Sequence, residues 1–352
     1  MTRASSNDLD YLATRLHARR SRMAERARLD ELCRARSLPE LGRAIFPGGE
    51  FSAATDFQRR LVQDLAAEIS GCLKHLDEDD QDFVAWLLAR FQVENMKILL
   101  RGYLNHSPLE ILQLHLVSLP DGLGLDASAL LAAKSLEEFV GLLPAGSPRS
   151  RLHAVMASQR EPSLFVLEAA LDAGYFQELL ARNNQLRGGE TEIIKPQISQ
   201  EANLFQFLLV VRGRFHFGLT AETLLPLRVS DGGDVVEWFR AVLSAPDMLS
   251  AAKCVVGIVI DALPAAGRSG GEQSVVDISV IEALAWQRYL RLANSAFRRS
   301  HMGVGAVAGY FGVRRMEIAN LITLSESIRL GVDERETRAR MIPRTDLEVA
   351  HV

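Results

Sequence analysis

Apolar side chains recur at every third or fourth position along most of the chain. Leucine and alanine supply most of these positions, arginine and glutamate fill many of the positions between them, and alternating runs of valine and isoleucine are scarce. A spacing of three to four residues is typical of amphipathic helices, whereas a period of two would indicate strands. The sequence therefore predicts an all-α protein.

The same pattern predicts that the chain does not insert into a membrane. Its most apolar stretch, residues 255–260, lies between Lys253 and Asp261. A helix that crosses a bilayer needs roughly 20 apolar residues in succession. The N-terminus begins polar and then becomes rich in arginine, without the apolar core of a signal peptide. We expect any association with a membrane to run through a partner.

Three kinds of segment recur in the same order, which is the usual signature of an internal repeat. The first is a short amphipathic run with an acidic residue, and its copies begin at Leu38, Leu136 and Val236, 98 and 100 residues apart. The second is a longer helical pattern over residues 51–65, 167–176 and 281–290, of which the first copy is the weakest.

The third kind of segment is a helical run that contains asparagine, followed by leucines and then an arginine. The asparagines are Asn95, Asn203 and Asn320, and the arginines are Arg101, Arg212 and Arg329. Asparagine is unfavourable inside a helix unless its side chain bonds to nearby backbone. We therefore expect the three asparagines to tie adjacent helices or bundles together, and the arginines to contact helix C-terminal carbonyls or an acidic partner.

The repeat predicts three stacked bundles of about three helices each, because one amphipathic helix cannot bury its own apolar stripe. The expected units are residues 1–103, 104–216 and 217–352, with joints near 102–108 and 215–220. The stretches 144–148 and 267–271 are expected to be loops. Residues 9–36 form a further helix candidate, with one apolar stripe and an arginine-rich face. The stripe holds Leu12, Leu16, Met23 and Ala27, and the basic face holds Arg15, Arg19, Arg22 and Arg26.

Charge and motif content exclude several classes of function. The formal net charge is −4, which gives no overall attraction to nucleic acid. The three cysteines, Cys33, Cys72 and Cys254, are far apart and suit a reducing compartment. The acidic run 77–82 is expected to begin a helix, not to hold magnesium. The eight histidines form no metal-binding spacing, and neither a P-loop nor a nucleophile elbow occurs. We predict no catalytic, cofactor-binding or metal-ligating residue.

The ordered set of motifs resembles the C subunit of V-type ATPases, which is the equivalent of the d subunit in eukaryotic pumps. The resemblance rests on the opening run from Tyr11 to Arg22, on residues 94–101 and on residues 310–321, and it spans about residues 9–342. The middle copy departs from the pattern at Ala202, where the first copy has Glu94.

That resemblance implies a funnel of three related helical bundles without chemistry of its own. It implies a peripheral rotor component on the cytoplasmic side of the membrane, which joins a central shaft, made of the D and F subunits, to the membrane rotor ring. It implies no nucleic-acid partner.

Two alternatives remain at this stage. Residues 307–321 also fit a helix-turn-helix, with glycine at the turn and Arg314 and Arg315 opening a recognition helix. The acidic chain and the repeat count against a DNA-binding regulator, which would expose those arginines. A generic helical-repeat scaffold is the other alternative.

Overall fold

The computed structural model describes residues 6–120, 122–229, 236–263, 277–300 and 303–343. These residues form helices and turns, with only an isolated bridge between Val256 and Ile260 in place of strands. The predicted all-α class is confirmed. No helix in these ranges is both long and apolar enough to cross a membrane.

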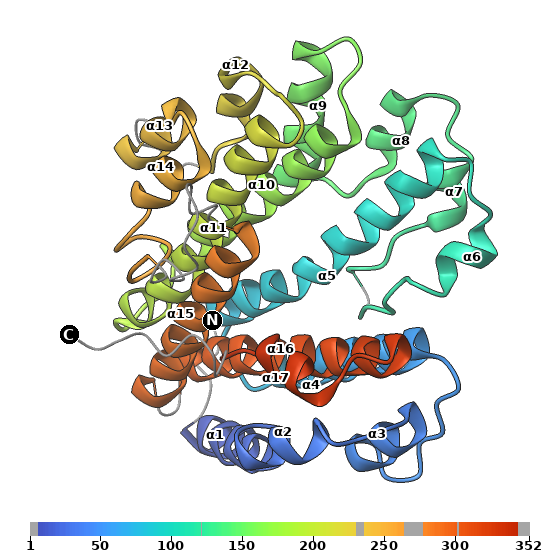
Figure 1. The fold of residues 1–352 in the computed structure, drawn as a ribbon, viewed down its shortest axis with the longest axis vertical. Coiled ribbons are helices and arrows are strands. Elements are labelled where there is room, and N and C mark those ends of the chain that lie inside the picture. The colour runs from blue at the N-terminus through green and yellow to red at the C-terminus, as the bar shows by residue number, and fades with distance from the viewer. Residues whose placement is uncertain (1–5, 121, 230–235, 264–276, 301–302, 344–352) are drawn as a thin grey trace.

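Six longer helices form three antiparallel pairs. The pairs are α4 (Ala54–Leu73) with α5 (Glu78–Leu104), α10 (Leu164–Asn183) with α11 (Glu190–Phe215), and α15 (Ile278–Arg299) with α16 (Val304–Leu330). Each pair also packs against the next, because α5 contacts α10, α11 contacts α15 and α16 contacts α4. The six helices therefore form a closed ring (Figure 1).

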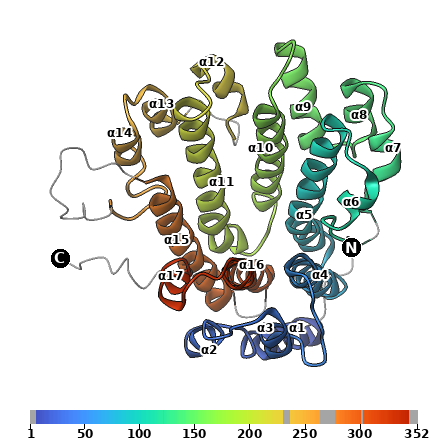
Figure 2. The same ribbon diagram turned by 45° about the vertical axis from the view of Figure 1, so that its right-hand side comes forward.

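Shorter helices connect and cover the pairs. Between the first two pairs lie α6 (Leu109–Gln113), α7 (Ala127–Leu131), α8 (Leu136–Leu142) and α9 (Ser147–Ser158). Between the second and third lie α12 (Ala221–Leu224), η1 (Leu225–Leu227), α13 (Glu237–Ser244) and α14 (Met248–Lys253). The N-terminal helices α1 (Ser6–Arg20), α2 (Ala27–Leu32) and α3 (Leu38–Ile45) and the C-terminal α17 (Glu334–Ala339) cover the remaining side (Figure 2).

Local sequence explains where these helices begin. The three short runs with an acidic residue are α3, α8 and α13, as predicted. Ser37 and Ser135 cap α3 and α8, since each hydroxyl accepts from the backbone N–H three residues later. The acidic run also behaves as predicted, because Asp77 accepts from the Asp80 N–H at 3.1 Å and α5 begins at Glu78.

The second helix of each pair, which we call the long helix (α5, α11 or α16), ties down the segment that follows it through one amide side chain. Asn95 exchanges two hydrogen bonds with the backbone of Val117, at 2.8 and 2.9 Å. Asn320 makes the same pair of bonds with Ile342, both at 2.8 Å, and both partners lie 22 residues downstream. In the middle copy Gln206 has this role and accepts from the Val229 N–H at 3.1 Å.

The expectation for the asparagines is thus confirmed at two positions and wrong at the third. Asn203 lies three residues before Gln206 and is only half-buried. The recurring contacts support three related units, and the boundaries 1–103, 104–216 and 217–352 stay a prediction. The side of α16 that α6 and α12 cover on the other long helices is covered by α17, which Arg338 joins to the backbone of Asp30 at 2.8 Å.

Asn95→Ala is expected to lower the free energy of unfolding by about 2 kcal/mol, because it leaves a partly buried N–H and carbonyl of Val117 without partners. Urea denaturation measures this value. Asn203→Ala is the matched control and should change stability by less than about 0.5 kcal/mol. Equal losses in the two variants would contradict the role given to Asn95.

Two sequence interpretations are corrected by the fold. The helix-turn-helix is wrong, because residues 307–321 lie within the single uninterrupted helix α16, where Arg314 and Arg315 are buried or nearly so. The N-terminal candidate is two helices with a turn between them. Leu12 and Leu16 are buried in the core, and Ala27 is exposed. The expected loop 267–271 lies outside the described residues.

The N-terminal ends of the three long helices lie close together. Asp79, in the first turn of α5, pairs at 2.7 Å with Arg187, which lies just before α11. Glu190, the first residue of α11, accepts from the Gly305 N–H of α16 at 2.7 Å and from Ser300. From this common end the helices spread apart toward their C-terminal ends (Figure 1).

Candidate functional site: a central cavity above a buried charge network

A cavity of about 330 Å³ lies where α5, α10, α11 and α15 face one another. Its apolar wall includes Phe165, Phe176, Phe205 and Trp286. The charged groups that line it come from the same four helices. They are Arg90, Lys97, Glu168, Asp172, Glu201, Arg212 and Glu282.

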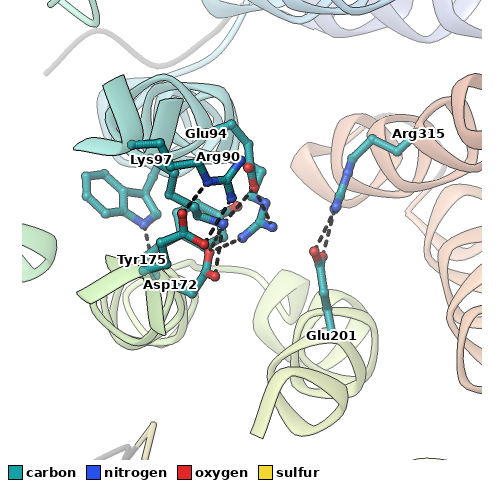
Figure 3. A network of polar contacts seen from close by, with 10 residues as sticks. Arg90, Glu94, Lys97, Asp172, Tyr175, Glu201 and Arg315 are labelled. Carbon is teal, nitrogen blue, oxygen red and sulfur yellow. Dashed lines mark hydrogen bonds and ion pairs between the residues drawn. The ribbon is translucent and has the colours of Figure 1, made fainter. Parts of the chain in front are cut away.

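The first part of the charge network joins α5 to α10. Asp172 of α10 accepts from Arg90 at 2.9 Å and from Lys97 at 2.9 Å, both on α5 (Figure 3). Glu94 completes the group, at 2.8 Å from Arg90 and 3.0 Å from Lys97. The Lys97 side chain is only 8% exposed. Two cations and two carboxylates therefore compensate one another within this group.

The second part joins α11 to α16. The Arg315 guanidinium holds both oxygens of Glu201 at 2.8 Å, a two-pronged arrangement (Figure 3). The side chains are 15% and 7% exposed. The same guanidinium lies 5.4 Å from the Phe311 ring centroid and 3.4 Å from the Tyr289 hydroxyl. A planar, charged group with bidentate and aromatic contacts is the environment that arginine fills and lysine does not.

The two parts meet at equivalent positions of the three long helices. Arg90, Glu201 and Arg315 each lie five residues before the amide that ties down the following segment, namely Asn95, Gln206 and Asn320. The repeat thus brings one charged side chain from each long helix to the centre. A negative group stands between two positive ones, so the copies attract one another and do not repel.

Burial and neighbouring charge have opposite effects on the pKa of the carboxylates. Burial alone would raise the pKa of Glu201, but Arg315, through its charge and hydrogen bonds, and then Arg90 lower it below its usual value. Burial likewise opposes, and Arg90 and Lys97 outweigh, so that the pKa of Glu94 is also lowered. Both carboxylates are ionised at neutral pH, as the ion pairs require.

The tyrosines around the network stay protonated. Burial raises the pKa of Tyr289 to about 12, with the nearby charge of Glu201 acting in the same direction. Burial also raises the pKa of Tyr175, whose backbone carbonyl accepts from the Trp86 indole at 3.1 Å. These rings close the lower side of the cavity with groups that remain neutral.

Above the network, two exposed ion pairs occupy matching places in the repeat. Arg101 of α5 pairs with Glu168 of α10, and Arg212 of α11 pairs at 2.9 Å with Glu282 of α15. Arg329 pairs within its own helix, at 2.6 Å from Glu326. The arginines predicted to contact helix carbonyls or a partner therefore contact acidic side chains of this chain.

The arrangement fixes helices to one another by charge. It holds three cations (Arg90, Lys97 and Arg315) against three carboxylates, so its net charge is zero. No group of three or more histidine, cysteine or acidic side chains suited to a metal ion occurs in the part of the chain that the structure describes. Sequence reasoning missed this network. The available signal was charged residues among apolar neighbours, as at Arg90 between Ala89 and Phe91.

Comparison with known proteins identifies relatives along most of the chain. The family model described as the ATP synthase (C/AC39) subunit matches residues 12–340. The C subunit of the A-type ATP synthase of Methanosphaera stadtmanae is 21% identical over 333 residues, a stretch that covers 91% of this chain and 83% of the relative.

Proposed function

The chain belongs to the ATP synthase (C/AC39) subunit family, and from this premise we propose that it is a non-catalytic rotor component of a rotary ion-translocating ATPase. In this role it links the D and F subunits of the central shaft to the membrane rotor ring and transmits torque between them. The family match over residues 12–340 is the observation that carries the proposal.

The closed ring of helices supports a force-bearing role. A joint that transmits torque must not shear between its parts, and here each helix pair is braced by two neighbours. The charge network adds direct links between pairs, through Asp172 with Arg90 and through Glu201 with Arg315. Buried pairs of this kind are costly to separate, because each partner would be left as an uncompensated charge.

The diverging ends of the long helices support a docking site for the shaft. The last residue of each long helix is a large apolar side chain that is exposed, namely Leu104, Phe215 and Leu330. Phe217, 50% exposed, extends the α11 end and packs at 4.6 Å against Phe165 of the cavity wall. We call Leu104, Phe215, Phe217 and Leu330 the mouth residues. Exposed apolar groups at a shared end suit a partner that covers them.

Phe217→Ser is expected to weaken binding of a purified D–F shaft about tenfold or more, since buried aromatic anchors dominate interface energies. The dissociation constant is measured by calorimetry with D and F subunits from the same organism. Tyr11→Ser is the matched control, because it removes a ring that is 55% exposed on α1. It should leave the constant within about twofold, as truncations outside an interface do.

Two outcomes separate the parts of this proposal. If the wild-type chain binds neither the shaft nor the membrane ring, the rotor role is wrong. If both variants bind the shaft as tightly as the wild type, the rotor role stands and the mouth residues are not the docking site.

A further inference from the structure

A second cavity, of about 500 Å³, lies outside the central network. It is enclosed by the α1–α2 turn, by α15 and α16, and by the segment at Ile342 and Pro343. Four arginines line it, against two carboxylates, Glu25 and Glu317. The arginines are Arg20, Arg26, Arg291 and Arg298.

Positive charge in this cavity is only partly compensated. Glu317 pairs with Arg314, which is not part of the lining, and Arg291 pairs with Asp261. Glu25 lies 3.6 Å from Arg20. Arg26 and Arg298 are both exposed and form no ion pair with any residue in the described ranges.

The arginines act on one another across the cavity. The pKa of Arg20 is lowered, first by burial and then by the like charges of Arg298 and Arg26, although Glu25 acts in the opposite direction. The Arg20 side chain is fixed by Asn294, which accepts from its guanidinium, and by the Phe297 ring at 4.8 Å. Three guanidinium groups are thus held near one another with a single nearby carboxylate.

Arg26 has a strained backbone, which is a second and independent observation. Its φ is 51° and its ψ −125°, at the turn between α1 and α2. Glycine is the residue that adopts this conformation without steric cost. Strain of this sort persists where the surrounding structure enforces it, and it is concentrated at ligand sites. The side chain of Arg26 lines the cavity all the same.

The remaining lining is apolar, with one polar exception. Leu29, Leu290 and Met316 contribute to one wall. Gln287 also lines the cavity, and its side-chain oxygen is buried without a hydrogen-bond partner. A buried polar atom of that kind is normally satisfied by another group.

We propose that this cavity binds an organic phosphate, with the phosphate held by Arg26, Arg298 and Arg20 and an apolar group against Leu29, Leu290 and Met316. The guanidinium fork matches phosphate oxygens in geometry and in charge. A concave site of several hundred Å³ suits a small ligand more than an extended acidic peptide. The phosphate could belong to a free nucleotide or to the headgroup of an anionic lipid.

Two binding measurements on the purified full chain distinguish these sources. Calorimetry with ATP tests a soluble ligand, and co-sedimentation with phosphatidylglycerol vesicles, against phosphatidylcholine vesicles, tests a lipid headgroup. We expect saturable binding in one arm at 150 mM salt. The double variant Arg26→Gln, Arg298→Gln should weaken it tenfold or more, since each charge-assisted bond is worth about a factor of ten.

The double variant Arg22→Gln, Arg299→Gln is the matched control, because it removes the same charge from exposed arginines outside the cavity. It should leave binding within twofold. No saturable binding in either arm overturns the proposal, as does an equal loss in the control or equal sedimentation with both kinds of vesicle. Saturation by an acidic peptide alone would also overturn it.

Arg26→Gly separates a ligand role from a structural one. We expect it to raise the melting temperature, because glycine relieves the strain, and to weaken phosphate binding in the same arm. A lower melting temperature would mean that Arg26 serves the fold, and the site would lose its main support.

Discussion

Replacing Glu201 with glutamine is expected to destabilise the protein by about 3–5 kcal/mol, because it leaves Arg315 buried without a compensating charge. Arg315 cannot escape this cost by losing its proton, since arginine stays charged in proteins. The Glu201 side chain is 7% exposed and holds the guanidinium through two bonds of 2.8 Å. Urea denaturation, followed by circular dichroism, gives the change in the free energy of unfolding.

Glu168→Gln is the control for this prediction. It removes the same charge from the pair with Arg101, whose side chain is 50% exposed and can turn into water. Exposed pairs contribute about 0–1 kcal/mol. If the two variants lose equal stability, the buried network does not hold α11 to α16 as we infer.

The effect of Glu201→Gln should also depend on pH in a defined direction. The pKa of Glu201 is lowered in the folded protein from an ordinary value of 4.5. The stability that its ionised form contributes is therefore present above that value and is lost as the pH falls through the lower, folded pKa. The difference between wild type and variant should stay constant from pH 8 to about 5.5 and shrink in more acidic solution.

Gly309→Ala is expected to destabilise the protein by about 3 kcal/mol or more, because the added methyl group meets backbone and not a movable side chain. A Cβ at Gly309 would overlap the Phe297 nitrogen and lie 2.7 Å from the Ala293 carbonyl oxygen. Both atoms belong to α15, so α15 and α16 would have to move apart. A melting temperature lowered by several degrees, or failure to fold, is the expected result.

Gly141→Ala serves as the control, since it makes the same change within α8. A Cβ there would meet nothing within 4 Å. Alanine favours helix over glycine by about 0.5–1 kcal/mol, so this variant should be slightly more stable than the wild type. If Gly309→Ala is tolerated as well as Gly141→Ala, the close approach of α15 to α16 is not needed for the ring.

Local features of the sequence predicted much of the fold. Ser37, Ser135 and Asp77 were readable as helix starts because a cap depends only on the next few residues. Asn95 and Asn320 were readable as ties, since asparagine inside an apolar helix has few other uses. Asn203 was misassigned because its match in sequence lies three residues from Gln206, the residue that the packing brings against Val229.

The sequence by itself determined that the chain is helical, where most helices begin and that their pattern recurs three times, because these properties depend on side chains a few residues apart. Only the tertiary structure decided which charges meet. Arg315 and Glu201 are 114 residues apart, and Arg26 and Arg298 are separated by most of the chain. Nothing local distinguishes such residues from arginines and glutamates on the surface. Their partners and their burial follow from the closure of the ring, which is a property of the whole chain.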